Sequence, residues 1–384
     1  MQKHFYFLPI ALALILAITG CGKTNTTTDI SDQPITQNTT PIKIGFIGPM
    51  TGDAAHYGEN MQVALNIAAT EINNTGGING RPIELLTEDG QCDTKASLNA
   101  ANKLINISKV PVIIGGVCSA ETLATAPLAE NSKIVLISPA STNPQITTAG
   151  DYIFRLIPSD TFQGKYVASY AYDKLQKRKV AILFNPDKEW SAGVKEEFKK
   201  TFLALGGEIV TEEGTNSTSR DIRAQILKIK QANPELIYFP SMVESGIVGI
   251  KQMKELELTT PILGGDVWDD AKIPQSLGAI ADGVRYTVVS DKTLPPSFVT
   301  EMEKTPQGTD INNYSPRGYD ALKIIANIMK KVDDDPEKIK DELYKLKNYR
   351  GIADDYSLDE NGDVINGTYT IKEFRDGKIV EVKE

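Results

Sequence analysis

Residues 112–120 read VIIGGVCSA, and residues 134–142 read IVLISPAST. Each segment begins with a short apolar run and changes abruptly to glycine, serine, proline or threonine. Such runs are typical of buried strands in a parallel sheet, and open α/β sheets bind their ligands at the carboxyl ends of those strands. We therefore predict a small-molecule site beside these two turns.

Ser119 stands where a helix is expected to start, shortly after Gly115 and Gly116. A serine hydroxyl and the free N–H groups of a helix start can hold an anion such as a carboxylate, and the two glycines let a ligand approach the backbone. A helix cap with a tight turn and no ligand would have the same sequence. The prediction of a site therefore depends on the two turns together.

The composition is that of an ordinary globular protein. The chain has 384 residues, of which 41% are hydrophobic, and this length suggests two or three domains. Its 41 Lys and Arg against 50 Asp and Glu give a net charge of −9. This balance does not favour a nucleic-acid partner.

Residues 1–20 are predicted to be a lipoprotein signal peptide. Lys3 precedes an apolar run that is short for a transmembrane helix. The run ends in LAITGC at residues 16–21, which resembles the lipobox of bacterial lipoproteins and implies cleavage before Cys21 and lipid on that cysteine. An ordinary signal peptide with an incidental cysteine is the alternative. Residues 21–41 are mostly polar and are predicted to be a flexible tether.

From residue 42 onward, predicted strands alternate with amphipathic helices. The order strand, helix, Gly-Gly, strand occurs at residues 42–86 and again at residues 180–211, which predicts two similarly built lobes. The first helix is expected to bury the face made by Met61, Ala64, Leu65, Ala68 and Ile72.

Three further local features are predicted. A helix face is expected at Leu98, Ala101 and Ile105. Near the C-terminus, the pairs Asn361-Gly362 and Asp376-Gly377 predict hairpin turns between antiparallel strands.

Groups that would support catalysis are scarce. Beyond the signal peptide His56 is the one histidine, which is too few for a zinc site of the usual His and Cys kind, and nothing beside it favours a Ser-His-acid triad. The acidic pairs at residues 269–270 and 354–355 are interpreted as solvated loop charges or helix starts. We expect no enzyme activity, no metal and no cofactor.

Cys92 and Cys118 are the remaining cysteines of the chain besides Cys21. In an exported chain a disulfide is the expected state, and two free thiols are the alternative in a reducing compartment. The bond would close a loop of about 27 residues and stabilise the fold by roughly 3 kcal/mol. It would also fix the turn next to Ser119.

Four segments together resemble the leucine/isoleucine/valine-binding proteins of bacterial ABC importers, which are type I periplasmic binding proteins. The similarity covers almost the whole mature chain in order, at residues 44–58, 73–80 (NNTGGING), 114–121 and 136–142. It implies an α/β fold of two doubly wound lobes joined by three hinge crossings. The crossings are expected near Pro158, Ser290 and Asp363, with lobe 1 at residues 42–158 and 291–362 and lobe 2 at residues 159–290 and 363–384.

The resemblance also implies a set of ligand-binding residues. Ser119 and Thr142, with nearby backbone N–H groups, would hold an α-carboxylate, and the Ala140 carbonyl and Asp266 would meet an α-ammonium. A simple turn aspartate is the alternative for Asp266. The complete predicted set is Tyr57, Ser119, Ala140, Ser141, Thr142, Trp190, Met242 and Asp266.

Two of these positions differ from the family pattern. Trp190 stands where the family usually has a tyrosine, and residues 240–242 (Pro-Ser-Met) replace glycines and a tyrosine. Leucine-type specificity therefore stays open. Trp268 and His56 are further candidates for the border of the pocket.

The function implied by the resemblance is that of an exported, lipid-anchored substrate-binding protein of an ABC importer. It would capture an amino acid, with a branched-chain or other hydrophobic type favoured, by hinge closure and deliver it to a membrane permease. A sensory or receptor-type binding module of the same fold, for an amide or another small organic acid, is the alternative. An exported enzyme is disfavoured. We expect a monomer on the periplasmic face or outer surface of the membrane.

Overall fold

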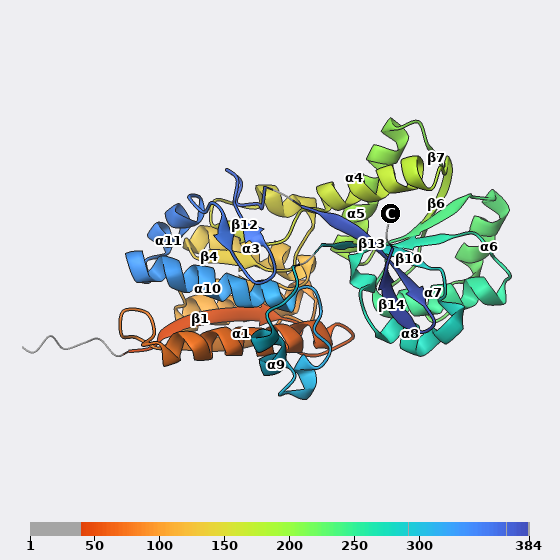
Figure 1. The fold of residues 1–384 in the computed structure, drawn as a ribbon. Coiled ribbons are helices and arrows are strands. Elements are labelled where there is room, and N and C mark those ends of the chain that lie inside the picture. Colours follow the sequence, from red (N-terminus) through yellow and green to blue (C-terminus); the bar gives the residue numbers. More distant parts are fainter. Residues whose placement is uncertain (1–39, 291, 366, 383–384) are drawn as a thin grey trace, which may run out of the picture. The chain divides into compact units, whose positions relative to one another are not determined.

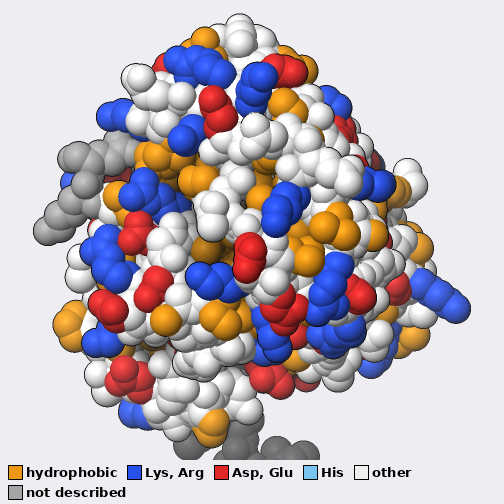
Figure 2. Space-filling view, turned by 90° about the vertical axis from the view of Figure 1, so that its right-hand side faces the viewer, with side chains coloured by type: hydrophobic (Ala, Val, Ile, Leu, Met, Phe, Trp, Pro, Cys, Tyr) orange, Lys and Arg blue, Asp and Glu red, His pale blue; other side chains and the backbone are white. Residues whose placement is uncertain are grey.

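The computed structural model describes residues 40–290, 292–365 and 367–382. The predicted signal peptide, Cys21 and most of the predicted tether lie outside these residues. Within the described part of the chain, no helix has both the length and the apolarity needed to cross a membrane. Acidic and basic side chains are interspersed over the face of the molecule shown in Figure 2.

The first half of the chain forms a five-stranded parallel sheet (Figure 1). The strand order is β2-β1-β3-β4-β5, and every neighbouring pair is parallel. The two quoted segments contain β3 and β4, which are buried along their whole length and are apolar except for Ser138 at the end of β4. The strands are β1 (Ile42–Gly48), β2 (Ile83–Asp89), β3 (Val112–Gly115), β4 (Val135–Ser138) and β5 (Ile153–Arg155).

Helices cover both faces of this sheet and give it two separate cores. One core contains α1 (Ala55–Asn74), α10 (Ser315–Val332) and α11 (Pro336–Leu343), and Figure 1 shows α10 beside α1. The predicted face of α1 is confirmed, because all five of its residues are at most 3% exposed. The other core contains α2 (Thr94–Asn102), the π-helix η1 (Lys103–Ser108) and α3 (Ser119–Ser132).

The predicted face of α2 is wrong at Leu98, which is 38% exposed. The residues that face the core are Ala100 and Ala101 of α2 and Leu104 and Ile105 of η1. Together with the buried Ser97, these residues have the spacing i, i+3, i+4, i+7 and i+8 of one helix face. Leu98 lies one position beyond Ser97, at the solvent-exposed edge of that face.

The second sheet has seven strands in the order β14-β13-β10-β9-β8-β6-β7. Strands β6 to β10 are parallel to one another, whereas β13 and β14 are antiparallel additions at one edge. The strands are β6 (Lys179–Phe184), β7 (Glu208–Gly214), β8 (Leu236–Phe239), β9 (Ile262–Gly264), β10 (Arg285–Val289), β13 (Tyr369–Arg375) and β14 (Lys378–Glu381).

Helices also cover both faces of the second sheet. One face packs against α4 (Asp160–Ser169), η3 (Tyr170–Lys174) and α5 (Glu189–Ala204). The other packs against α6 (Arg223–Ala232), α7 (Val243–Glu255) and α8 (Lys272–Leu277). The parallel parts of the two sheets have the same strand order, which confirms the repeated pattern expected from the sequence.

The remaining elements are short. They are the 3-10 turns η2 (Pro144–Thr148), η4 (Asp266–Trp268), η5 (Gly278–Ile280) and η6 (Pro306–Gly308), the helix α9 (Pro296–Met302), and the small antiparallel pair β11 (Tyr349–Arg350) and β12 (Asp355–Tyr356).

One of the two predicted hairpin turns is confirmed. Asp376 and Gly377 have φ angles of +52° and +71° and connect β13 to β14. Gly362 also has a positive φ, of +78°, but the chain around it is closed by a single bridge between Leu358 and Val364. The Asn361-Gly362 turn is therefore not a hairpin between strands.

The chain passes between the sheets three times, after β5, after β10 and before β13. Asp363 lies on the side of the first sheet, where it forms an ion pair with Arg155 of β5. The predicted lobe boundaries themselves stay a prediction.

Candidate ligand-binding site

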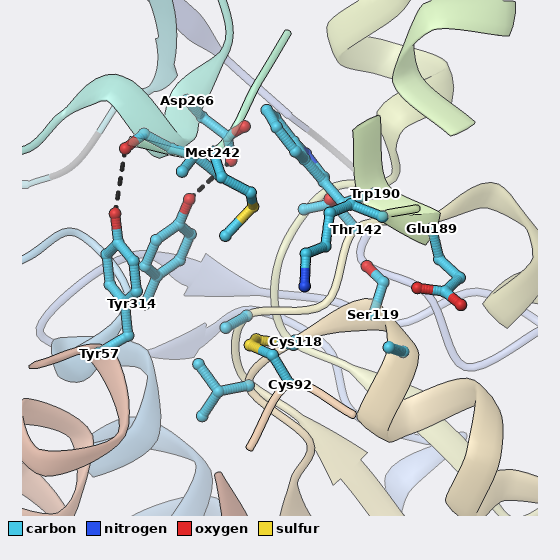
Figure 3. A pocket seen from close by; sticks show the side chains of 15 residues that line it. Tyr57, Cys92, Cys118, Ser119, Thr142, Glu189, Trp190, Met242, Asp266 and Tyr314 are labelled. Carbon is cyan, nitrogen blue, oxygen red and sulfur yellow. Dashed lines mark hydrogen bonds between the residues drawn. A yellow bond between two sulfur atoms is a disulfide. The ribbon is translucent and has the colours of Figure 1, made fainter. Parts of the chain in front are cut away.

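A pocket lies among the loops that follow the parallel strands of both sheets (Figure 3). In each sheet the strand order reverses beside the first strand, between β1 and β3 and between β6 and β8, and such reversals open a crevice where α/β sheets bind ligands. The lining residues are Tyr57, Cys92, Val117, Cys118, Ser119, Ala120, Ala140, Thr142, Lys188, Glu189, Trp190, Met242, Asp266, Val267 and Tyr314.

Most of the predicted binding residues line this pocket: Tyr57, Ser119, Ala140, Thr142, Trp190, Met242 and Asp266. Ser141 does not line the pocket. The Ser141 hydroxyl donates to the Gly116 carbonyl at 2.9 Å and lies 2.7 Å from the Thr122 hydroxyl, so it holds the turn after β4 against the turn after β3. The roles of the lining residues in binding stay predictions.

The two border candidates lie in different places. Trp268 is fully buried in the core of the second sheet, where its indole N–H donates to the Ser241 carbonyl at 2.9 Å, so it does not border the pocket. His56 lines an adjoining cavity that shares Tyr57, Cys92, Lys188 and Met242 with the pocket.

The start of α3 is built around the buried carboxylate of Glu121. Oε2 accepts the N–H groups of Val117 at 2.9 Å and Cys118 at 3.0 Å, and Oε1 accepts that of Cys92 at 3.1 Å. Burial raises the pKa of Glu121 to about 7, although these three hydrogen bonds act in the opposite direction. A Cβ atom at Gly116 would lie 2.2 Å from that of Glu121, so the close approach requires glycine.

Glu121 decides which N–H groups are left for a ligand. Those of Val117 and Cys118 are already bound. The N–H groups of Ser119 and Ala120 begin the helix and form no hydrogen bond within the described residues. Sequence reading missed Glu121, although a glutamate three residues after the helix cap is a known signal for this arrangement.

The predicted disulfide between Cys92 and Cys118 is confirmed. The two Cα atoms are 5.3 Å apart, and both residues line the pocket. The bond therefore ties the loop after β2 to the first residue before α3, directly beside Ser119 (Figure 3).

Asp266 supplies a buried carboxylate from the second lobe. It is 1% exposed, its Oδ2 accepts the Tyr314 hydroxyl at 2.9 Å, and its Oδ1 has no hydrogen-bond partner among the described residues. Burial raises the pKa of Asp266, and Gln163 and Tyr314 oppose that rise. Figure 3 shows Asp266 and Tyr314 on one side of the pocket and Ser119 and Glu189 on the other.

Asp160 is a second buried carboxylate, which sequence reading missed. Its N–H donates to the Thr142 carbonyl at 2.8 Å, and neither carboxylate oxygen meets a donor within hydrogen-bond distance in the described part of the chain. Burial raises the pKa of Asp160 and the negative charge of Asp266 adds to the rise. The positive charge of the buried Arg155 opposes this rise.

Arg155 holds the loop that contains Thr142. Its guanidinium forms a bidentate ion pair with Asp363, with both N–O distances 2.6 Å, and it donates to the carbonyls of Thr142 and Asn143, both at 3.0 Å. Asp363 also accepts the Thr147 hydroxyl at 2.7 Å. This network around the fully buried Arg155 fixes the turn after β4 and the third chain crossing to one another.

The two lobes contact each other on both sides of the pocket. On one side the Tyr57 hydroxyl donates to the Val267 carbonyl at 3.0 Å, and His56 Nε2 lies 2.8 Å from Asp270 Oδ2. On the other side the Asn143 amide donates to the Glu189 carbonyl at 2.7 Å. The arrangement encloses an apolar space with hydrogen-bond donors at one end and a carboxylate at the other.

Two α/β lobes connected three times around one pocket define the fold of a type I binding protein. Residues 41–378 match the family described as periplasmic binding protein. The leucine-, isoleucine-, valine-, threonine-, and alanine-binding protein of Pseudomonas aeruginosa is 29% identical over 358 residues, which cover 89% of this chain and 92% of that protein.

Solved structures agree with this match. The leucine-binding protein LivK from Thermotoga maritima has a TM-score of 0.81 and 28% identity, covering 89% of this chain and 98% of that one. LivJ from Streptococcus pneumoniae, in complex with isoleucine, has a TM-score of 0.80 and 26% identity, covering 89% and 100%. The chain belongs to the periplasmic binding protein family, as the resemblance implied, and its role is to bind a substrate outside the cytoplasm.

Proposed function

We propose that this chain is the substrate-binding lipoprotein of an ABC importer and that it captures an L-α-amino acid, with a branched-chain or other hydrophobic type favoured. The observation that supports this most strongly is the buried carboxylate of Asp266, whose Oδ1 has no partner among the described residues. An ionised carboxylate without a cation is costly to bury, so a ligand ammonium would stabilise it.

The other groups of the pocket fit the rest of an amino acid. The α-carboxylate would meet the N–H groups of Ser119 and Ala120 and the hydroxyl of Thr142, at the positive end of α3. The side chain would lie against Trp190 and Met242. No bond is broken in this mechanism: the lobes close over the ligand, hold it, and release it to a permease. We therefore propose that the chain is not an enzyme.

The relatives support the same class of ligand. Their names specify leucine, isoleucine, valine, threonine and alanine in one case and leucine in another, and one structure contains isoleucine. The lipobox at residues 16–21 supports an anchor at Cys21, with residues 21–41 as a tether to a monomeric two-lobed body. The lobes would comprise residues 42–158 with 291–362 and residues 159–290 with 363–384.

Isothermal titration calorimetry of the purified full chain against L-amino acids and small carboxylates tests this proposal. We expect at least one hydrophobic L-amino acid to bind with one site per chain. In Asp266→Asn the affinity for that amino acid should fall by roughly 100- to 1000-fold, because one partner of a buried ion pair is lost. Its analogue without the amine, 4-methylpentanoate in the case of leucine, should be affected far less.

Asp376→Asn is the matched control, because it removes the same charge from an exposed turn of the same lobe. Asparagine tolerates the positive φ of that position. Equal losses for the amino acid and its desamino analogue would refute the ammonium role of Asp266. Binding of carboxylates but of no amino acid would refute the proposed ligand class.

A further inference from the structure

Lys188 is a cation in the pocket wall that has no acidic partner. It is half-buried, it precedes α5 directly, and it lines both the pocket and the adjoining cavity. Among the residues that the structure describes, its ammonium group forms no ion pair and no hydrogen bond. Lys195 and Lys199 of the same helix behave differently, since each pairs with Glu212 at 2.6 Å. No other lysine or arginine of the described chain lines either cavity.

A chain of hydrogen bonds places the backbone of Lys188 next to the start of α3. The Asn143 N–H donates to the Ser119 hydroxyl at 3.3 Å, and the Asn143 side-chain amide donates to the carbonyl of Glu189 at 2.7 Å. Glu189 is the next residue after Lys188. The residue before α5 is thus held, from the second lobe, close to the free N–H groups of Ser119 and Ala120 in the first lobe.

The groups around the pocket leave Lys188 without a negatively charged partner, which an anionic ligand would supply. Glu121 is occupied by three backbone N–H groups, and Asp266 Oδ2 is occupied by Tyr314. Asp266 Oδ1 and Glu189 also belong to the pocket, but neither forms an ion pair with Lys188. The start of α3 and the Lys188 ammonium both favour a negative group, and a carboxylate matches both. An amine would offer the lysine no negative charge, and a neutral amide could accept its hydrogen bond but would not supply the opposite charge.

We propose that Lys188 binds the carboxylate of the ligand from the second lobe and makes the site selective for carboxylates over the corresponding amides. This rests on the proposed binding function and specifies the ligand further. The carboxylate is the α-carboxylate of an amino acid or a carboxylate on its side chain, and the two sources are distinguished below. Because Ser119 and Lys188 belong to different lobes, a carboxylate held by both also connects the lobes.

The test is calorimetric titration of the full chain as wild type, Lys188→Met and Lys251→Met. Lys251 is exposed, belongs to the same lobe and lines neither cavity, so it controls for the loss of one positive charge. The probes are the L-amino acid that the wild type binds best in the panel above, its carboxamide, L-glutamate and 4-methylpentanoate. Thermal unfolding of each variant checks that the fold is kept.

In Lys188→Met the affinity for the amino acid should fall by roughly 10- to 100-fold, as expected for loss of a charge-assisted hydrogen bond. The affinity for the carboxamide should change by less than about twofold, and Lys251→Met should change neither. A loss confined to L-glutamate would assign Lys188 to a side-chain carboxylate. A loss for both amino acids would assign it to the α-carboxylate.

Two outcomes would overturn the proposal. One is equal affinity of wild type and Lys188→Met for every carboxylate that the wild type binds. The other is a wild type that binds the carboxamide as tightly as the acid, or that binds no carboxylate at all. If the wild type binds 4-methylpentanoate but no amino acid, the proposed amino-acid function fails, while the loss of that binding in Lys188→Met would still support the role of the lysine.

Discussion

Buried charged side chains organise the pocket at the residue scale. Arg155 and Asp363 fix the loop of Thr142, and Glu121 fixes the start of α3 through three backbone N–H groups. A buried charge is tolerated only where hydrogen bonds or an opposite charge replace the lost water. The loops that line the pocket are therefore positioned by these charges as well as by apolar packing.

The titration of Glu121 should be visible in the stability of the protein. Its pKa is raised from 4.5 to about 7, so between these values the folded chain keeps a proton that the unfolded chain has released. Stability from this group is therefore highest at low pH and falls as the pH rises. The free energy of unfolding of the wild type, relative to Glu121→Gln, should decrease by roughly 2 to 3 kcal/mol from pH 5 to pH 8.

Urea denaturation of both proteins at the two pH values measures this difference. A constant loss of hydrogen bonds in Glu121→Gln shifts both values equally and does not affect the comparison. An unchanged difference between pH 5 and pH 8 would show that Glu121 does not titrate in this range.

The residues of the site could be predicted from the sequence where a local motif contains them, and less well elsewhere. Ser119 and Asp266 follow short apolar strands in recognisable turns, and both line the pocket. Arg155 and Asp363 are 208 residues apart, and Asp160 approaches Asp266 across the fold. Neither pairing has a local signal, because the contacts form only when distant strands come together.

At the scale of elements, a disulfide bond connects two of the loops that line the pocket. The Cys92–Cys118 bond spans a sequence separation of 26 residues and joins the end of β2 to the start of α3. The double variant Cys92→Ala/Cys118→Ala should be less stable than the oxidised wild type by about 3 kcal/mol, since the unfolded chain gains loop entropy. Guanidinium denaturation measures this loss.

Reduction of the wild type is the companion measurement. Reduced wild type and the double variant should unfold at similar denaturant concentrations and should both bind the ligand more weakly than the oxidised protein. If the double variant were as stable and bound as tightly as the oxidised wild type, the bond would have no part in holding the turn.

The strands and helices were largely predictable, because their apolar periodicity is local. The predictions for β3, β4 and the buried face of α1 are confirmed. One error is the choice of face in α2, where Ser97 is buried and the neighbouring Leu98 lies at the exposed edge of the core-facing side. The turn at Gly362 looks like a hairpin turn in sequence, but among the described residues a single β-bridge, between Leu358 and Val364, pairs the chain on its two sides.

At the scale of the whole molecule, capture of the ligand depends on the contacts between the two lobes. His56 Nε2 of the first lobe lies 2.8 Å from Asp270 of the second lobe, and the hydroxyl of the adjacent Tyr57 donates to Val267. Burial raises the pKa of Asp270, but hydrogen bonds from His56 and Lys272 outweigh this and the pKa is lowered. Glu59 and Asp310 line a cavity together with His56, so its surroundings are mainly acidic.

The contact between His56 and Asp270 should strengthen ligand binding, because it connects the two lobes beside the pocket. The His56 side chain is 44% exposed, so the effect is modest. In His56→Ala the dissociation constant of the best-binding amino acid should rise by roughly two- to fivefold.

A double-mutant cycle with Asp270→Asn separates this contact from the other interactions of the two residues. The effects of the two substitutions on the dissociation constant should be coupled. Additive effects would contradict a role in holding the lobes together.

The repeated order of strand, helix, Gly-Gly and strand was enough to predict two lobes of the same build. The antiparallel strands β13 and β14, which extend only the second sheet, were predicted from the Asp376-Gly377 turn, but not their place at the edge of that sheet. The contacts across the pocket could not be predicted, because His56, Asn143 and Tyr314 find their partners only when the lobes meet.

The chain has two tryptophans, and their positions differ in a useful way. Trp190 lines the pocket, and its indole N–H has no acceptor among the described residues, whereas Trp268 is sealed in a core with its N–H bound to Ser241. Occupation of the pocket would alter the emission of one fluorophore and leave the other as an internal reference. The protein thereby contains an optical reporter of its own occupancy that needs no attached dye.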